Sequence, residues 1–136
     1  PQCCVRIEIT LPCLLPKRKQ KYGTEFLLDP FTAAMSQYAK THIMPKMQHC
    51  VVCFSHVYDK ALPERRIRDY DNLELKQYLD VAASFILTDD SGLLCDAYNT
   101  TELGERDCTR ISIMDSQHFP DWLSTRQSAL QSISDL

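Results

Sequence analysis

The sequence lacks the features that mark membrane-spanning, nucleotide-binding and serine-hydrolase proteins. No stretch approaches the ~20 consecutive apolar residues of a membrane-spanning helix, and we expect no signal peptide. Only 3 glycines occur among 136 residues, and none of them forms a phosphate-binding glycine loop. A G-x-S-x-G nucleophile motif and a histidine-rich metal signature are also missing. We therefore expect no membrane partner. The sequence also does not indicate a nucleotide-binding protein, a serine hydrolase or a histidine-based metalloenzyme.

Cysteine is abundant, but its distribution does not indicate a disulfide framework. The 7 cysteines are an odd number and are scattered through predicted strands. They are Cys3, Cys4, Cys13, Cys50, Cys53, Cys95 and Cys108. We predict that they are reduced, small apolar residues, which places the protein in the cytoplasm.

The spacing Cys50-x-x-Cys53-x-x-His56 is superficially that of a zinc site. The surrounding residues predict a strand, in which side chains three positions apart point to opposite faces. One zinc ion therefore cannot easily collect both thiolates, and we do not predict a zinc site.

The length predicts a single domain over residues 1–136. Because the chain starts at Pro1 without a methionine, we expect it to be a fragment of a longer polypeptide. Residues 1–68 carry 11 Lys/Arg against 5 Asp/Glu, a net of +6, whereas residues 69–136 carry 4 against 13, a net of −9. This division suits a phosphate-attracting surface beside an acidic cation site, and it equally suits two halves that neutralise each other.

Hydrophobic periodicity predicts the order β-α-β-α-β-β-α. Asp29 and Pro30 should cap and start the first helix, and Asp71 or Asn72 should cap the second. The two later strands should pair in an antiparallel hairpin. The ranges are strand 4–10, helix 30–41, strand 48–58, a helix ending near residue 85, strands 93–98 and 108–114, and a C-terminal segment 116–136 whose helix is entered at Pro120. We predict an α/β (α+β) fold, a mixed sheet of about four strands packed with two to three helices.

Two acidic motifs bracket the second predicted helix. Asp69 and Asp71 lie at i and i+2, on one side of an extended segment, and Asp89-Asp90 follows the helix. Together they could hold Mg²⁺, which prefers hard oxygen ligands. Alternatively, Asp71 or Asn72 caps the helix, the Asp89-Asp90 pair belongs to a turn, and the remaining acids are solvated. The residues alone favour this second interpretation.

The combined pattern resembles the RusA-like Holliday junction resolvases. It consists of an arginine-rich run leading into Arg68-Asp69-Tyr70-Asp71-Asn72, a helix, and then Asp89-Asp90 before a strand. The similarity extends in outline over most of the chain. Within this family, the chain most resembles uncharacterised proteins of bacterial mobile elements, which share short sequence stretches such as LLPKRK and L-T-D-D.

The resemblance implies a homodimeric nuclease that nicks branched DNA, such as four-way junctions, with Mg²⁺ or Mn²⁺. Asp69, Asp71 and Asp90 would be catalytic metal ligands with Asp89 as a helper, and Lys76 would be the catalytic lysine. The DNA-binding residues would be Lys17, Arg18, Lys19, Lys21, Arg65, Arg66 and Arg68.

The sequence departs from the family pattern in two ways. Leu75 stands where the family lysine is expected, and Lys76 follows one position later. The net charge is −3, whereas these resolvases tend to be basic. These departures leave enzymatic activity open and define an alternative. That alternative is a catalytically impaired RusA-like domain of a mobile-element protein, which binds nucleic acid or a protein. A third reading is an interaction domain of a larger chain whose remainder supplies the activity.

Overall fold

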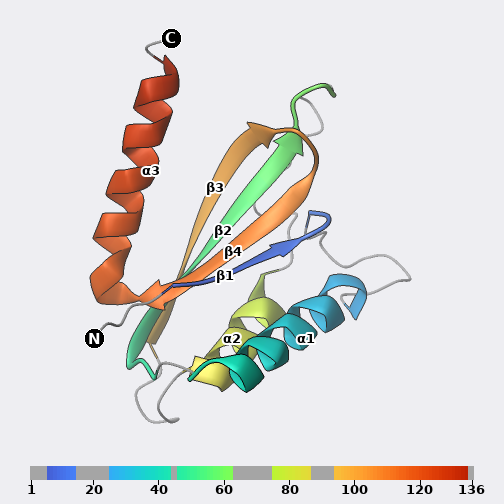
Figure 1. Ribbon diagram of the computed structural model, residues 1–136, viewed down its shortest axis with the longest axis vertical. Helices are drawn as coiled ribbons and strands as arrows, with labels where there is room; N and C mark the ends of the chain where they lie inside the picture. The colour runs from blue at the N-terminus through green and yellow to red at the C-terminus, as the bar shows by residue number, and fades with distance from the viewer. Residues whose placement is uncertain (1–5, 15–24, 44–45, 63–74, 87–93, 135–136) are drawn as a thin grey trace.

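The computed structural model describes residues 6–14, 25–43, 46–62, 75–86 and 94–134 (Figure 1). The order of helices and strands is the predicted one. The elements are β1 (Ile7–Leu11), α1 (Glu25–Thr41), β2 (His49–Asp59), α2 (Lys76–Ile86), β3 (Leu94–Gly104), β4 (Cys108–Asp115), the 3₁₀ turn η3 (Ser116–His118) and α3 (Phe119–Ser134).

The strands form one mixed sheet in the order β1-β4-β2-β3. β4 runs antiparallel to both of its neighbours, and β2 and β3 run parallel from the pair His49–Leu94 to the pair Asp59–Gly104. Helices α1 and α2 lie on one side of the sheet, and α3 lies on the other (Figure 1). The predicted α+β class, with a four-stranded mixed sheet and helices against it, is confirmed.

The predicted hairpin of the two later strands is wrong. β4 lies between β1 and β2, while β3 pairs with the far edge of β2. β3 continues to Gly104, through most of the polar segment predicted to be a loop. Polar side chains are tolerated there because β3 is an edge strand with one open side. Strand β2 needs a hydrogen-bonding partner on each edge, and β3 and β4 supply one each.

Strand β2 separates two apolar clusters, and residues 50–58 are all buried. Val52 and Phe54 face α1 and α2, whereas Val51 and Cys53 face the start of α3. Coverage on both faces explains the continuous apolar run, because a strand exposed on one side would alternate with polar residues. The strand predicted over residues 48–58 is therefore a central strand, covered on both faces.

Helix α1 begins earlier than the predicted start after Asp29, so the predicted cap is wrong. It starts at Glu25 and contains Pro30 within the helix, although it ends at Thr41 as predicted. Leu27, Phe31 and Met35 are four residues apart and buried. Burying Leu27 on the same stripe favours the additional helical turn, and this offsets the hydrogen bond that Pro30 cannot donate.

Helix α2 also begins elsewhere than predicted. It starts at Lys76, and the backbone N–H groups of Tyr78 and Leu79 both donate to the Leu75 carbonyl at 3.1 Å. The helix therefore starts later than a cap at Asp71 or Asn72 would place it, and both of these residues lie outside the described part of the structure. Its buried face includes Tyr78, Ala82 and Ile86. Leu75 packs against the same cluster, which explains why the helix starts here.

The terminal helix α3 forms as predicted and packs by the aromatic residues of its first turn. Asp115 caps η3, its Oδ1 accepting from the Gln117 N–H at 2.9 Å. Phe119 and Trp122 then contact Tyr98, with ring centroids 5.2 and 6.0 Å away. Within the described residues, no helix is long and apolar enough to cross a membrane.

Gly104 provides a test of packing where β3 ends. A Cβ at this position would lie 2.6 Å from Val57 Cγ1, and Val57 is 2% exposed. Because a buried valine has little freedom to move, Gly104→Ala should lower the free energy of unfolding by about 1–3 kcal/mol. Urea unfolding measures this loss. Val57→Ala should recover part of it in the double mutant, and an unchanged midpoint for Gly104→Ala would contradict the packing.

His56 should make the fold sensitive to acid. The ring is fully buried, and its Nε2 donates to Asn99 Oδ1 at 2.9 Å. Burial lowers the pKa of His56 below its ordinary value of 6.5, while the Asn99 hydrogen bond partly opposes this shift. The stabilisation by neutral His56 is therefore complete above pH 6.5 and is lost as pH falls through the lower folded pKa.

We expect the unfolding free energy to fall between pH 6.5 and pH 5 by up to about 1.4 kcal/mol per pH unit from this group. Urea unfolding across this range measures the slope for the wild type, for His56→Gln and for the control His118→Gln, whose histidine is exposed. His56→Gln should flatten the slope. Equal slopes for all three proteins would contradict the assignment.

Candidate functional site

Most of the predicted nuclease residues lie outside the described part of the structure. The only one within it is Lys76. Those outside are the acids Asp69, Asp71, Asp89 and Asp90 and the basic residues Lys17, Arg18, Lys19, Lys21, Arg65, Arg66 and Arg68. Their site assignments therefore stay predictions.

Lys76 is the first residue of α2 and its side chain is 81% exposed. Its Nζ lies 3.4 Å from Asp80 Oδ2, one helical turn along the exposed surface. Leu75 is partly buried against the core cluster. At the start of α2, Leu75 therefore packs toward the core while Lys76 lies on the exposed face.

The described elements flank both predicted acidic motifs. The segment containing Asp69 and Asp71 joins β2 to the start of α2, and the segment containing Asp89 and Asp90 joins the end of α2 to β3. With 11 residues, α2 is roughly 16 Å long. Among the described residues, no group of three or more His, Cys, Asp or Glu side chains could hold a metal ion.

The strand register confirms the reason for rejecting a zinc site. Cys50 belongs to the cluster under α1 and α2, and Cys53 to the cluster on the opposite face. The two thiols therefore lie on different sides of the sheet.

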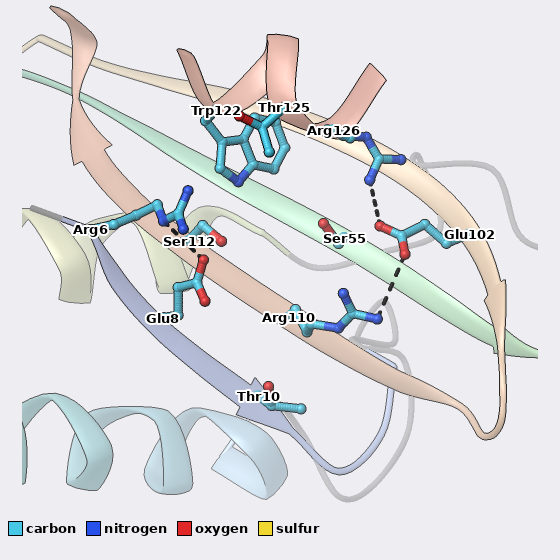
Figure 2. A pocket seen from close by; sticks show the side chains of 10 residues that line it. All are labelled: Arg6, Glu8, Thr10, Ser55, Glu102, Arg110, Ser112, Trp122, Thr125 and Arg126. Atoms are coloured by element: carbon cyan, nitrogen blue, oxygen red, sulfur yellow. Dashed lines mark hydrogen bonds and ion pairs between the residues drawn. The ribbon is translucent and has the colours of Figure 1, made fainter. Parts of the chain in front are cut away.

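A polar pocket of about 380 Å³ lies between the sheet and α3 (Figure 2). It is on the sheet face opposite α1 and α2. Trp122, Thr125 and Arg126 of α3 form one wall. The sheet side contributes the other lining residues, namely Arg6 immediately before β1, Glu8 and Thr10 from β1, Ser55 from β2, Glu102 from β3, and Arg110 and Ser112 from β4.

One row of polar residues crosses the whole sheet beneath this pocket. Thr10 of β1 is in register with Arg110 of β4, which pairs with Ser55 of β2, which pairs with Thr100 of β3. Residues in register on neighbouring strands present their side chains on the same face. Toward the start of α3 the same face becomes apolar, with Val51 and Met114 buried there. The aromatic residues at the start of α3, Phe119 and Trp122, therefore cover the apolar part of this face, and its polar part lines the pocket.

Glu102 connects the two walls of the pocket through two arginines (Figure 2). Arg126 Nη1 donates to Glu102 Oε2 at 2.6 Å, and these side chains are only 17% and 18% exposed. Arg126 also lies over the Trp122 ring, 5.9 Å from its centroid. Arg110 is farther from Glu102, at 3.6 Å, and is 53% exposed. Arg126 is thus held from two sides, whereas Arg110 is only loosely engaged.

The sequence contained part of the signal for this pocket. In the predicted strand 4–10, Arg6, Glu8 and Thr10 alternate with apolar residues, and this pattern places the three side chains on one face. The contributions of Arg110 and Ser112 could not be recognised, because the predicted hairpin put β4 beside β3 instead of β1. Only the strand order brings these residues together.

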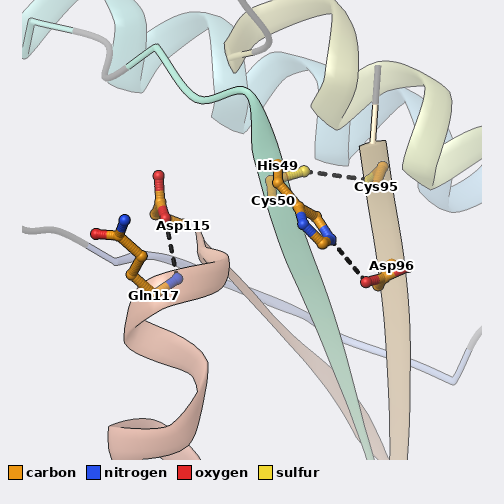
Figure 3. Close-up of polar contacts among 6 residues, drawn as sticks. All are labelled: His49, Cys50, Cys95, Asp96, Asp115 and Gln117. Atoms are coloured by element: carbon orange, nitrogen blue, oxygen red, sulfur yellow. Dashed lines mark hydrogen bonds and ion pairs between the residues drawn. The ribbon is translucent and has the colours of Figure 1, made fainter. Parts of the chain in front are cut away.

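A second unpredicted feature is a pair of cysteines on β2 and β3 (Figure 3). Cys50 and Cys95 are in register, and the Cys50 thiol donates to Cys95 Sγ at 3.2 Å. This hydrogen bond and burial raise the pKa of Cys50, and the same hydrogen bond lowers the pKa of Cys95. Burial raises the pKa of Cys53 to about 12. Cys95 is therefore the thiol of the pair that ionises more readily, although the sequence showed no basic neighbour.

Comparison with known proteins gives a family. No curated protein matches the chain. One family model matches residues 5–136, which include every described element. The chain therefore belongs to the family of unknown function DUF6100.

Proposed function

We propose that this protein is a Mg²⁺-dependent, structure-selective DNA endonuclease resembling the RusA-type Holliday junction resolvases. The observation that carries the proposal is the pairing of the motif Arg68-Asp69-Tyr70-Asp71-Asn72 with Asp89-Asp90. The two motifs occur in the two connections that flank α2. The parallel pairing of β2 with β3 through a helical crossover is compatible with this role.

The acidic residues fit the chemistry of the proposed ion. Asp69, Asp71 and Asp90 would hold Mg²⁺, or Mn²⁺ in its place, through carboxylate oxygens, with Asp89 beside them. When bound, the ion supplies activation of water and neutralises charge on the phosphate under attack. The carboxylates would fix the position of the ion, and the resemblance assigns Asn72 to the turn after Asp71.

The basic residues would bind the DNA backbone by charge, independently of its sequence. They belong to two segments, residues 17–21 and 65–68. In a twofold homodimer, two such sites would cut opposing strands of a junction symmetrically. We include a cytoplasmic location in the proposal, because an odd number of scattered cysteines favours a reducing compartment.

The test is cleavage of a synthetic four-way junction labelled on each strand in turn. We expect nicks with Mg²⁺ or Mn²⁺, none with EDTA, and no cleavage of a linear duplex of the same sequence. Paired nicks on opposing strands would support a homodimer. An intact junction in both metals, across several branched substrates, would contradict nuclease activity.

A second candidate is a domain that binds junctions without cutting them. Leu75 occupies the expected lysine position and packs against the core, and Lys76 is paired with Asp80 on the exposed face. This candidate predicts a gel shift without cleavage, weakened by neutralising Lys17, Arg18 and Lys19. The absence of any shift at low salt would contradict it.

Lys76→Met separates the two candidates. An exposed pair one turn apart on a helix contributes only about 0.2–0.5 kcal/mol, so the fold should be almost unchanged. If Lys76 is catalytic, Lys76→Met should lose cleavage while its binding to the junction stays unchanged. If Lys76 has no catalytic role, the variant and the wild type should behave alike in both assays.

A further inference from the structure

We propose that the pocket between α3 and the sheet binds the phosphate group of a small organic phosphate ester. The site lies on the sheet face opposite α2 and uses none of the residues assigned to nuclease activity. It is therefore a second site whose existence does not depend on the proposed function.

The floor of the pocket offers hydroxyl groups at buried positions. Ser55 and Ser112 line it and are only 5% and 6% exposed. Thr100 does not line the pocket itself but lies next to its floor, in register with Ser55; it is 8% exposed, and its Oγ1 has no hydrogen-bond partner among the described residues. Burying hydroxyl groups costs free energy unless they form hydrogen bonds. A ligand with several acceptor oxygens would bond to this floor.

The charges of the lining favour an anion. Three arginines and two glutamates line the pocket, which leaves an excess of one positive charge. Glu102 is the partner of both Arg126 and Arg110, yet one carboxylate neutralises only one guanidinium. Arg110, at 3.6 Å from Glu102 and 53% exposed, is free to turn its planar fork toward a ligand. That fork matches the oxygens of phosphate, which it can bind through two parallel hydrogen bonds.

The size of the pocket indicates that the phosphate carries an organic group. Its volume of about 380 Å³ falls within the range typical of small-molecule sites. Trp122 provides an apolar wall beside the charged lining. The arginine fork and the hydroxyl floor would hold the phosphate, and the Trp122 side would take the organic part.

The experiment uses Trp122, the single tryptophan of the chain, as an internal reporter of its own pocket. The protein, in a phosphate-free buffer, is titrated with inorganic phosphate and with ribose 5-phosphate while tryptophan emission is recorded. Ribose and potassium chloride at matched ionic strength are the ligand controls. We expect a saturable change with both phosphates, tighter for the ester, and none with ribose or chloride.

Arg110→Gln should weaken ribose 5-phosphate binding about tenfold or more, because it removes a charged donor. Arg110→Lys, which keeps the charge but loses the fork, should lie between this variant and the wild type. Arg106→Gln is the matched control, an exposed arginine outside the pocket, and should bind as the wild type does. Thermal unfolding confirms that each variant is folded.

Three results would overturn the proposal. They are a linear response without saturation, equal weakening by Arg106→Gln, and a change caused by a DNA junction but by neither phosphate. The failure of this proposal would leave junction cleavage untouched, because that assay depends on other residues. Conversely, a protein that cuts no DNA should still bind ribose 5-phosphate.

Discussion

Replacing Asp71 with asparagine should reduce metal-dependent cleavage of a four-way junction by about 100-fold or more. Asparagine keeps the size of the side chain and one oxygen but removes the negative charge that attracts the cation. Loss of a group that merely orients a metal ligand typically costs 10–100-fold in metal affinity or activity. Replacing a residue that binds the ion directly should therefore reduce cleavage by at least the upper end of this range. Initial rates at saturating Mg²⁺ measure the effect.

The matched control is Asp29→Asn, which makes the same chemical change at an exposed position on α1. It should cleave at the wild-type rate. Both variants should unfold at the wild-type urea midpoint, and Asp71→Asn should still bind the junction in EDTA. A wild-type rate for Asp71→Asn would remove Asp71 from the proposed site. Equal losses in both variants would point to an effect on charge in general.

Phe54→Ala should lower the free energy of unfolding by about 3–5 kcal/mol. Phe54 is fully buried at the centre of β2, in the cluster under α1 and α2, and is in register with Ile111 of β4. Truncation removes a large apolar surface and leaves a cavity, because the two flanking strands prevent the site from collapsing. Domains of this size are stable by only about 5–15 kcal/mol, so the variant should be close to unfolding at 37 °C.

Urea unfolding followed by circular dichroism measures this cost. Leu103→Ala is the matched control, since Leu103 lies on β3 with 54% of its surface exposed. It should change stability by less than about 0.5 kcal/mol. A cost below about 1 kcal/mol for Phe54→Ala would show that the two faces of β2 are not packed as described.

The kind and order of the elements could be predicted because periodicity is a local property of the chain. Alternation between Ile7, Ile9 and their polar neighbours marks β1, and the continuous apolar run of β2 marks a strand covered on both faces. Helix starts were less predictable. Asp29 and Asp71 are good cap residues, but burying Leu27 and Leu75 moved the starts of both helices.

Residues 69–90 were singled out by sequence pattern and resemblance, and their metal-binding role stays a prediction. The pocket under α3 was missed, because its residues come from all four strands and a helix. A local alternation shows that Arg110 and Glu102 lie on strands, but not which strands are neighbours.

By itself the sequence determined the type and order of the elements and the acidic motifs, since each depends on residues close together in the chain. Only the tertiary structure decided that β4 inserts beside β1, that Cys50 meets Cys95, and that Glu102 joins Arg110 to Arg126. The physical reason is that strand order and register depend on hydrogen bonds and burial between distant segments. A short-range pattern cannot choose among the pairings that satisfy them equally well.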